Sequence, residues 1–145
     1  MIYLDVAYIA RLYFEDPGWE SVQALAARAP VACSVHGYAE TLSVMHRKYR
    51  EGALTKLQYG RTLEQFTLDC DEGAYRWLPL SDAVNARMKA AYQDLPPAVF
   101  LRASDALHLA SAAENQLAEI YSNDERLLGA AVHFGLRGID VIGAG

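Results

Sequence analysis

The stretch Ile2-Tyr3-Leu4-Asp5-Val6 opens the chain with an apolar run that contains a single acidic residue. Its apolar, β-rich composition and its length predict a short buried strand. From Ala7 to Phe14 the apolar residues recur at a helical spacing instead, and Asp16-Pro17-Gly18 should end that helix. A strand that leads directly into a helix is the building unit of parallel α/β sheets.

The same alternation continues to the end of the chain. Further strands are expected over residues 31–34, 75–80, 119–122 and 139–142. Further helices are expected over residues 19–29, 35–51, 56–68, 82–92, 101–116 and 124–134, with a turn at 69–73. This order predicts one α/β domain over residues 1–145, with a mostly parallel central sheet of four to five strands and helices on both faces.

The composition fits such a domain and restricts its surroundings. Of the 145 residues, 52% are hydrophobic and 21% are charged, so a core can form. No apolar stretch approaches the roughly 20 residues that cross a bilayer, and the start lacks the basic region of a signal peptide. We therefore expect no membrane association and a cytoplasmic location. Cys33 and Cys70 form no CxxC pair and are expected to be free thiols.

Four acidic residues stand beside sequence that should be buried, namely Asp5, Glu40, Asp105 and Asp124. Buried carboxylates are costly unless their charge is compensated. Asp5 and Asp124 follow strands, and sites in open parallel sheets form beyond the carboxyl ends of strands. Glu40 and Asp105 lie in expected helices that could direct them to the same edge. We predict that the four side chains converge, although Asp124 alone would also suit a helix cap.

Several carboxylates without a cysteine or histidine partner are typical ligands of a hard cation such as Mg²⁺ or Mn²⁺. Such a cation acidifies a bound water molecule, which can then attack a phosphodiester. The formal net charge of −5 argues against non-specific, phosphate-driven binding of nucleic acid. It does not exclude a nucleic-acid substrate, because bound cations invert the local field.

Four motifs contain these acids, at residues 2–5, 38–42, 101–110 and 121–124. Ile2-Tyr3-Leu4-Asp5, Tyr38-Ala39-Glu40-Thr41-Leu42, Leu101-Arg102-Ala103-Ser104-Asp105-Ala106-Leu107-His108-Leu109-Ala110 and Tyr121-Ser122-Asn123-Asp124 resemble the successive motifs of PIN-domain ribonucleases. The similarity is greatest to the VapC-like toxins of type II toxin–antitoxin systems, and it extends over essentially the whole chain. The run around Asp105 is its most specific part.

The resemblance implies a function as well as a fold. Asp5, Glu40 and Asp105 would be metal-ligating acids, and Asp124 would be a fourth acid with Ser122 as its hydroxyl-bearing companion. The protein would be a Mg²⁺- or Mn²⁺-dependent RNA endonuclease and a homodimer. A cognate antitoxin protein would cover the acidic groove and hold it inactive.

One departure from the family favours an alternative. The family often has Thr or Ser directly after the first Asp, where this chain has Val6 and Ala7. A hydroxyl that orients Asp5 is therefore expected to be missing, and such losses weaken metal sites. The alternative is a catalytically weak PIN-like binding module. A phosphatase of the haloacid-dehalogenase type would need a second Asp where Ala7 stands.

Basic residues near the acids could contact phosphate groups. Arg102 precedes Asp105 by three residues and is the best candidate, whereas Arg11, Arg47 and Lys48 are better explained as exposed charges or ion pairs. His108 is expected to pack or hydrogen bond within the domain rather than to act as a general base.

Overall fold

Five short strands form one sheet in the order β3-β2-β1-β4-β5, and all neighbouring strands are parallel. The strands are β1 (Ile2–Leu4), β2 (Val31–Ser34), β3 (Tyr75–Leu78), β4 (Glu119–Tyr121) and β5 (Arg137–Ile139). This computed structural model describes residues 1–143, so residues 144 and 145 of the expected domain lie outside the described part. The prediction of an α/β fold with a parallel sheet is confirmed.

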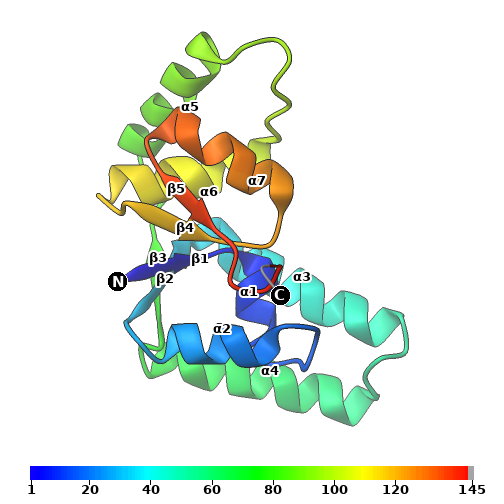
Figure 1. Cartoon of the computed structure of the whole chain (residues 1–145). Helices are drawn as coiled ribbons and strands as arrows, with labels where there is room; N and C mark the ends of the chain where they lie inside the picture. Colours follow the sequence, from blue (N-terminus) through cyan, green and yellow to red (C-terminus); the bar gives the residue numbers. More distant parts are fainter. Residues whose placement is uncertain (144–145) are drawn as a thin grey trace.

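Helices cover both faces of this sheet (Figure 1). They are α1 (Val6–Ala10), α2 (Trp19–Ala26), α3 (Val35–Arg50), α4 (Lys56–Asp71), α5 (Asp82–Asp94), α6 (Ala103–Glu114) and α7 (Glu125–Ala130), followed by the 3₁₀ helix η1 (Ala131–Phe134). The chain steps from β1 through β2 to β3 and then returns past β1 to β4 and β5. Because crossovers between parallel strands are right-handed, this reversal puts α1 to α4 on one face and α5 to α7 on the other.

The core lies between the sheet and these helices. Tyr3, Leu4 and Ile120 of the central strands are fully buried, as is Phe66 of α4. The Phe66 ring packs against four other aromatic rings, those of Tyr13, Tyr38, Tyr75 and Trp77. The C-terminal segment is fixed to α1, since the Tyr8 hydroxyl donates to Asp140 at 2.9 Å and accepts from the backbone amide of Val141.

Several boundaries differ from the sequence-based predictions, and in two cases a side chain caps the backbone. Strand β1 ends at Leu4, since Asp5 accepts a hydrogen bond from the Tyr8 amide and caps α1. The last strand is Arg137–Ile139 rather than 139–142, because Asp140 accepts from the amides of Ile142 and Gly143 and turns the chain. Helix 124–134 divides into α7 and η1.

The predicted turn at 69–73 was also placed too early. Helix α4 continues to Asp71, and Asp69 lies inside it. Asp69 accepts a hydrogen bond from the Tyr13 hydroxyl at 2.6 Å, so it is not part of a solvated loop. The chain turns at Gly73, whose positive φ of 80° suits glycine. Within residues 1–143, no helix combines the length and the apolar character needed to span a membrane.

Candidate active site

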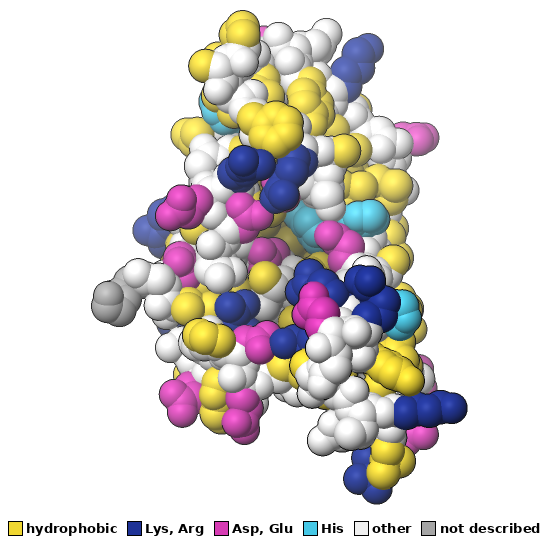
Figure 2. Space-filling view, turned by 90° about the vertical axis from the view of Figure 1, so that its right-hand side faces the viewer, with side chains coloured by type: hydrophobic (Ala, Val, Ile, Leu, Met, Phe, Trp, Pro, Cys, Tyr) yellow, Lys and Arg dark blue, Asp and Glu magenta, His cyan; other side chains and the backbone are white. Residues whose placement is uncertain are grey.

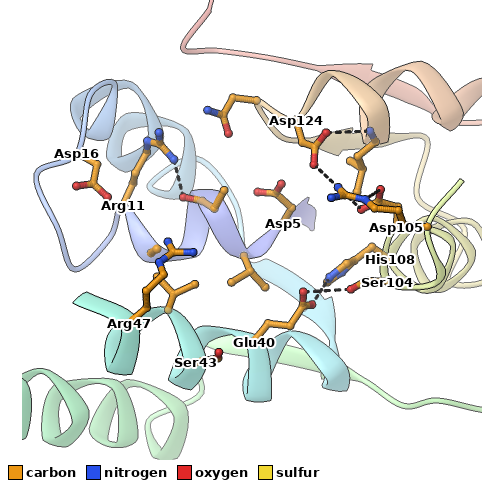
Figure 3. A pocket seen from close by; sticks show the side chains of 17 residues that line it. Asp5, Arg11, Asp16, Glu40, Ser43, Arg47, Ser104, Asp105, His108 and Asp124 are labelled. Carbon is orange, nitrogen blue, oxygen red and sulfur yellow. Dashed lines mark hydrogen bonds and ion pairs between the residues drawn. The ribbon is translucent and has the colours of Figure 1, made fainter. Parts of the chain in front are cut away.

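The four acids singled out in the sequence, Asp5, Glu40, Asp105 and Asp124, line one cavity of about 620 Å³ (Figure 3). The cavity lies at the carboxyl ends of β1 and β4, where the strand order reverses, which is the usual place for a site in a doubly wound sheet. Each acid comes from a different segment: the N-caps of α1 and α7, the middle of α3 and the first turn of α6. The predicted convergence is therefore observed.

Asp5 is buried at the floor of this cavity, with 7% of its surface exposed. One carboxylate oxygen accepts from the Tyr8 amide at 3.0 Å, and the other accepts a short hydrogen bond from the Ser122 hydroxyl. Burial raises the pKa of Asp5 to about 6, and the hydrogen bonds from Ser122 and Tyr8 offset only part of that rise. Asp5 therefore titrates close to neutral pH.

Ser122 connects two of the acids. Its hydroxyl donates to Asp5 and accepts from the backbone amide of Asp124 at 2.9 Å. The expectation that Asp5 lacks an orienting hydroxyl, based on Val6 and Ala7, was therefore wrong. The hydroxyl comes from the end of β4, which is adjacent to β1 in the sheet but distant in sequence.

Arg102 bridges Asp105 and Asp124 on this side of the cavity. Its Nε lies 3.0 Å from Asp105 Oδ2, and its Nη2 lies 2.7 Å from Asp124 Oδ2. Asp105 is almost completely buried, whereas Asp124 is partly exposed and also caps α7. One guanidinium thus compensates the charge of two carboxylates, and it faces the groove as the sequence indicated.

Glu40 is held on the opposite side of the cavity by residues of α6. Its Oε1 lies 2.6 Å from His108 Nε2, and its Oε2 accepts from the Ser104 hydroxyl at 3.1 Å. Burial alone would raise the pKa of Glu40, but the hydrogen bond and charge of His108 lower it below its ordinary value. For His108, burial lowers the pKa, and its contacts with Cys33 and Glu40 outweigh that effect and raise it to about 10.

The cavity also has basic residues at its margin, and Figure 2 shows Lys and Arg side chains beside acids and histidine around a hollow on this face. Arg11 and Arg47 line the cavity. The guanidinium of Arg11 donates to the backbone carbonyls of Ala7 and Pro17 at 2.8 and 2.9 Å. Lys48 forms an ion pair of 2.8 Å with Asp16, an acid that also lines the cavity.

The donor chemistry of the cavity fits a hard divalent cation, since all four acids offer carboxylate oxygens. Their spacing does not yet form a ligand set: within residues 1–143, no three Asp, Glu, His or Cys side chains are close enough to hold a metal together. Three of the acids are engaged by basic side chains instead: Asp105 and Asp124 by Arg102, and Glu40 by His108. A cation that bound these acids would have to displace these ion pairs.

Sequence reasoning placed His108 inside the domain but did not identify its contact with Glu40. The available signal was the spacing of Ser104 and His108, which puts both side chains on one face of α6. Which residue of α3 that face meets depends on how the two helices pack across the sheet, and a single sequence does not specify it.

The chain belongs to the PIN domain family, whose model matches residues 2–132. The prediction of that family is confirmed. No match was found among curated protein sequences.

Several solved structures share the fold. FitAcB from Neisseria gonorrhoeae is 19% identical, with a TM-score of 0.78 and 96% of each chain covered. VapBC2 from Rickettsia felis, bound to a DNA fragment from their promoter, is 15% identical, with a TM-score of 0.69 and coverage of 97% of this chain and 98% of that chain. A toxin–antitoxin complex from Klebsiella pneumoniae is 22% identical, with a TM-score of 0.57 and coverage of 86% and 87%.

Proposed function

We propose that this protein is a Mg²⁺- or Mn²⁺-dependent endoribonuclease and the toxin of a toxin–antitoxin pair. The observation that supports this most directly is the convergence of four acids from four segments on one cavity. PIN domains are in general nucleases, and an acidic cavity at the switch point of the sheet suits hydrolysis of a phosphodiester by a metal-activated water.

In this proposal Asp5, Glu40 and Asp105 hold one or two divalent cations, and Asp124 assists them. A bound cation would supply a water molecule acidic enough to be deprotonated near neutral pH. Ser122 keeps the Asp5 carboxylate turned toward the cavity through its hydrogen bond. Arg102 must release Asp105 and Asp124 before they can bind a cation, and its guanidinium is then free to pair with a substrate phosphate.

The proposed substrate is RNA, bound through its phosphates. Arg11 and Arg47 line the cavity at its margin, where they can neutralise phosphates on either side of the scissile bond. The cavity is open to solvent on the face drawn in Figure 2, so an internal segment of a strand can reach the acids without a free end. This arrangement suits an endonuclease better than an enzyme that trims ends.

The proposed partners are a cognate antitoxin and a second copy of the chain. Two of the similar structures are described as VapBC2 and as a toxin–antitoxin complex, which supports the antitoxin partner. An antitoxin segment with basic residues would complement the acids of the cavity. A cytoplasmic location would give such a toxin access to cellular RNA.

One observation favours the alternative of a catalytically weak PIN-like binding module. Three of the four acids already have charge partners without a cation, since Arg102 pairs with Asp105 and Asp124 and His108 pairs with Glu40. Such a module would bind RNA or a protein partner without needing Mn²⁺ and would leave the RNA intact.

Cleavage of end-labelled RNA distinguishes the two functions. Purified protein is incubated with Mg²⁺, with Mn²⁺ or with chelator. The same assay compares Asp5→Asn with the control Asp71→Asn, which changes an exposed acid outside the cavity. We expect internal cuts only with metal, a loss of about 100-fold or more in Asp5→Asn, and parental activity in Asp71→Asn. Equal cleavage by the parent and Asp5→Asn would refute the nuclease assignment.

A further inference from the structure

His108 is a buried side chain that connects the core to the acidic cavity. It is 3% exposed, and both of its ring nitrogens have short contacts. Nδ1 lies 2.6 Å from the Tyr3 hydroxyl, and Nε2 lies 2.6 Å from Glu40 Oε1, the contact drawn in Figure 3. The imidazole therefore occupies a fixed position between a residue of the sheet and an acid of the cavity.

Tyr3 fixes the imidazole from the opposite side to Glu40. Its side chain is fully buried in β1, and its oxygen accepts a hydrogen bond of 2.9 Å from the backbone amide of Ser34. The two rings also meet edge to face, with centroids 5.8 Å apart. A hydroxyl can donate or accept, so the contact with Nδ1 exists in either protonation state of His108.

Glu40, unlike Asp5 and Asp124, is held in the cavity by other side chains and by no backbone amide among the described residues. Asp5 and Asp124 accept hydrogen bonds from backbone amides as helix caps, whereas Glu40 lies in the middle of α3 at the end of a longer side chain. It is 31% exposed and contacts α6 through His108 and Ser104. Without those contacts its rotamer freedom would return.

We propose that Tyr3 and His108 are positioning residues, which hold the Glu40 carboxylate toward the cavity where the cation binds. This inference rests on the proposed function and adds two residues that act on the cation through Glu40. The hydrogen bonds run from the Ser34 backbone through Tyr3 and His108 to Glu40, so β2, β1, α6 and α3 all contribute. Residues that orient a metal ligand in this way commonly change metal affinity by 10- to 100-fold.

A matched pair of substitutions at position 108 separates the two contacts. The amide nitrogen of Gln can replace Nε2, so His108→Gln keeps a donor to Glu40. The shorter His108→Asn can replace only Nδ1, so it keeps the contact with Tyr3 and loses the one with Glu40. Tyr3→Phe removes only the distant hydroxyl. Tyr13→Phe is the control, since it removes a tyrosine hydroxyl bonded to Asp69 and Tyr75, outside the cavity.

The first measurement is calorimetric titration with Mn²⁺. We expect the Kd to rise by about 10-fold or more in His108→Asn, by less in His108→Gln and Tyr3→Phe, and not in Tyr13→Phe. In a Glu40→Gln background Tyr3→Phe should add no further loss, because both substitutions act on one ligand. Equal Kd values for His108→Asn and His108→Gln, or additive losses with Glu40→Gln, would overturn the proposal.

The second measurement needs no metal and so separates this proposal from the proposed function. The ¹³C NMR signal of the Glu40 carboxyl carbon in metal-free protein reports its hydrogen bonding. It should move in Tyr3→Phe and His108→Asn and stay in place in Tyr13→Phe. An unmoved signal overturns the positioning role. A moved signal in a protein that binds no Mn²⁺ overturns only the nuclease assignment.

Discussion

The guanidinium of Arg102 lies 2.7 Å from the carboxylate of Asp124 and holds it within the acidic cavity. The same side chain pairs with Asp105 at 3.0 Å. A cation supplied by the chain thus occupies the position between two acids where a divalent ion would reduce their repulsion. In the proposed function, Arg102 therefore competes with the divalent cation for these two acids.

Removing that competitor should strengthen metal binding. We predict that Arg102→Met lowers the Kd for Mn²⁺ by about threefold to tenfold, since two carboxylates lose a nearby positive charge. Calorimetric titration at low ionic strength measures the effect. Arg102→Lys keeps a positive charge and should change the Kd less. Arg126→Met removes an arginine that lies over the Phe100 ring, and it should leave the Kd unchanged. Weaker Mn²⁺ binding by Arg102→Met would mean that Arg102 organises the acids instead.

The raised pKa of Asp5 predicts a stability that depends on pH. Folding raises this pKa from 3.8 to about 6, so the folded protein binds the proton more tightly than the unfolded chain does. The resulting stabilisation is complete below pH 3.8 and is lost as the pH rises through 6. Asn carries no charge at any pH and is an equally good helix cap.

Asp5→Asn should therefore increase the free energy of unfolding at pH 7.5 by up to about 3 kcal/mol. At pH 4 the two proteins should differ little, because Asp5 is then protonated in the folded state. Urea denaturation in the presence of chelator, at both pH values, measures the difference. A stability gain of the same size at pH 4 and pH 7.5 would rule out titration of Asp5 as its cause.

Arg11 should act on RNA and not on metal. Its guanidinium is held by two backbone carbonyls and takes part in no ion pair among the described residues, so its charge is available to a phosphate. We predict that Arg11→Ala weakens RNA binding and reduces the salt dependence of the affinity by about one phosphate contact. Fluorescence anisotropy in an Asp5→Asn background measures this without cleavage. Arg61→Ala, on α4 outside the cavity, is the control, and an equal loss there would point to a non-specific charge effect.

Phe66 should dominate the packing of α4 on the rest of the domain. It is fully buried among four aromatic rings, so Phe66→Ala leaves a large cavity and should cost about 3–5 kcal/mol of stability. Phe100→Ala removes the same side chain from a position that is 64% exposed and should cost about 0.5 kcal/mol or less. Chemical denaturation compares the two, and similar losses would contradict the burial of Phe66.

The strands and most helices follow from the sequence because their apolar spacing is local. The ends of elements were less predictable where a side chain caps the backbone, as Asp140 does after β5. The convergence of Asp5 and Asp124 follows from the rule that parallel strands end at one edge. The hydrogen-bond partners of the acids do not follow from this rule. Ser122 reaches Asp5 because β1 pairs with β4, and His108 reaches Glu40 because α6 packs near α3.

The hydrogen bonds of Tyr8 to Asp140 and Val141 have a practical consequence for how the protein is produced. They bring the residues after β5 against α1, which contributes Ala7 and Ala10 to the cavity wall. Met1, by contrast, precedes β1 at the opposite edge of the sheet. A purification handle fused before Met1 would therefore begin at the edge of the sheet that lies away from the cavity, and it would leave the α1 side of the cavity wall untouched.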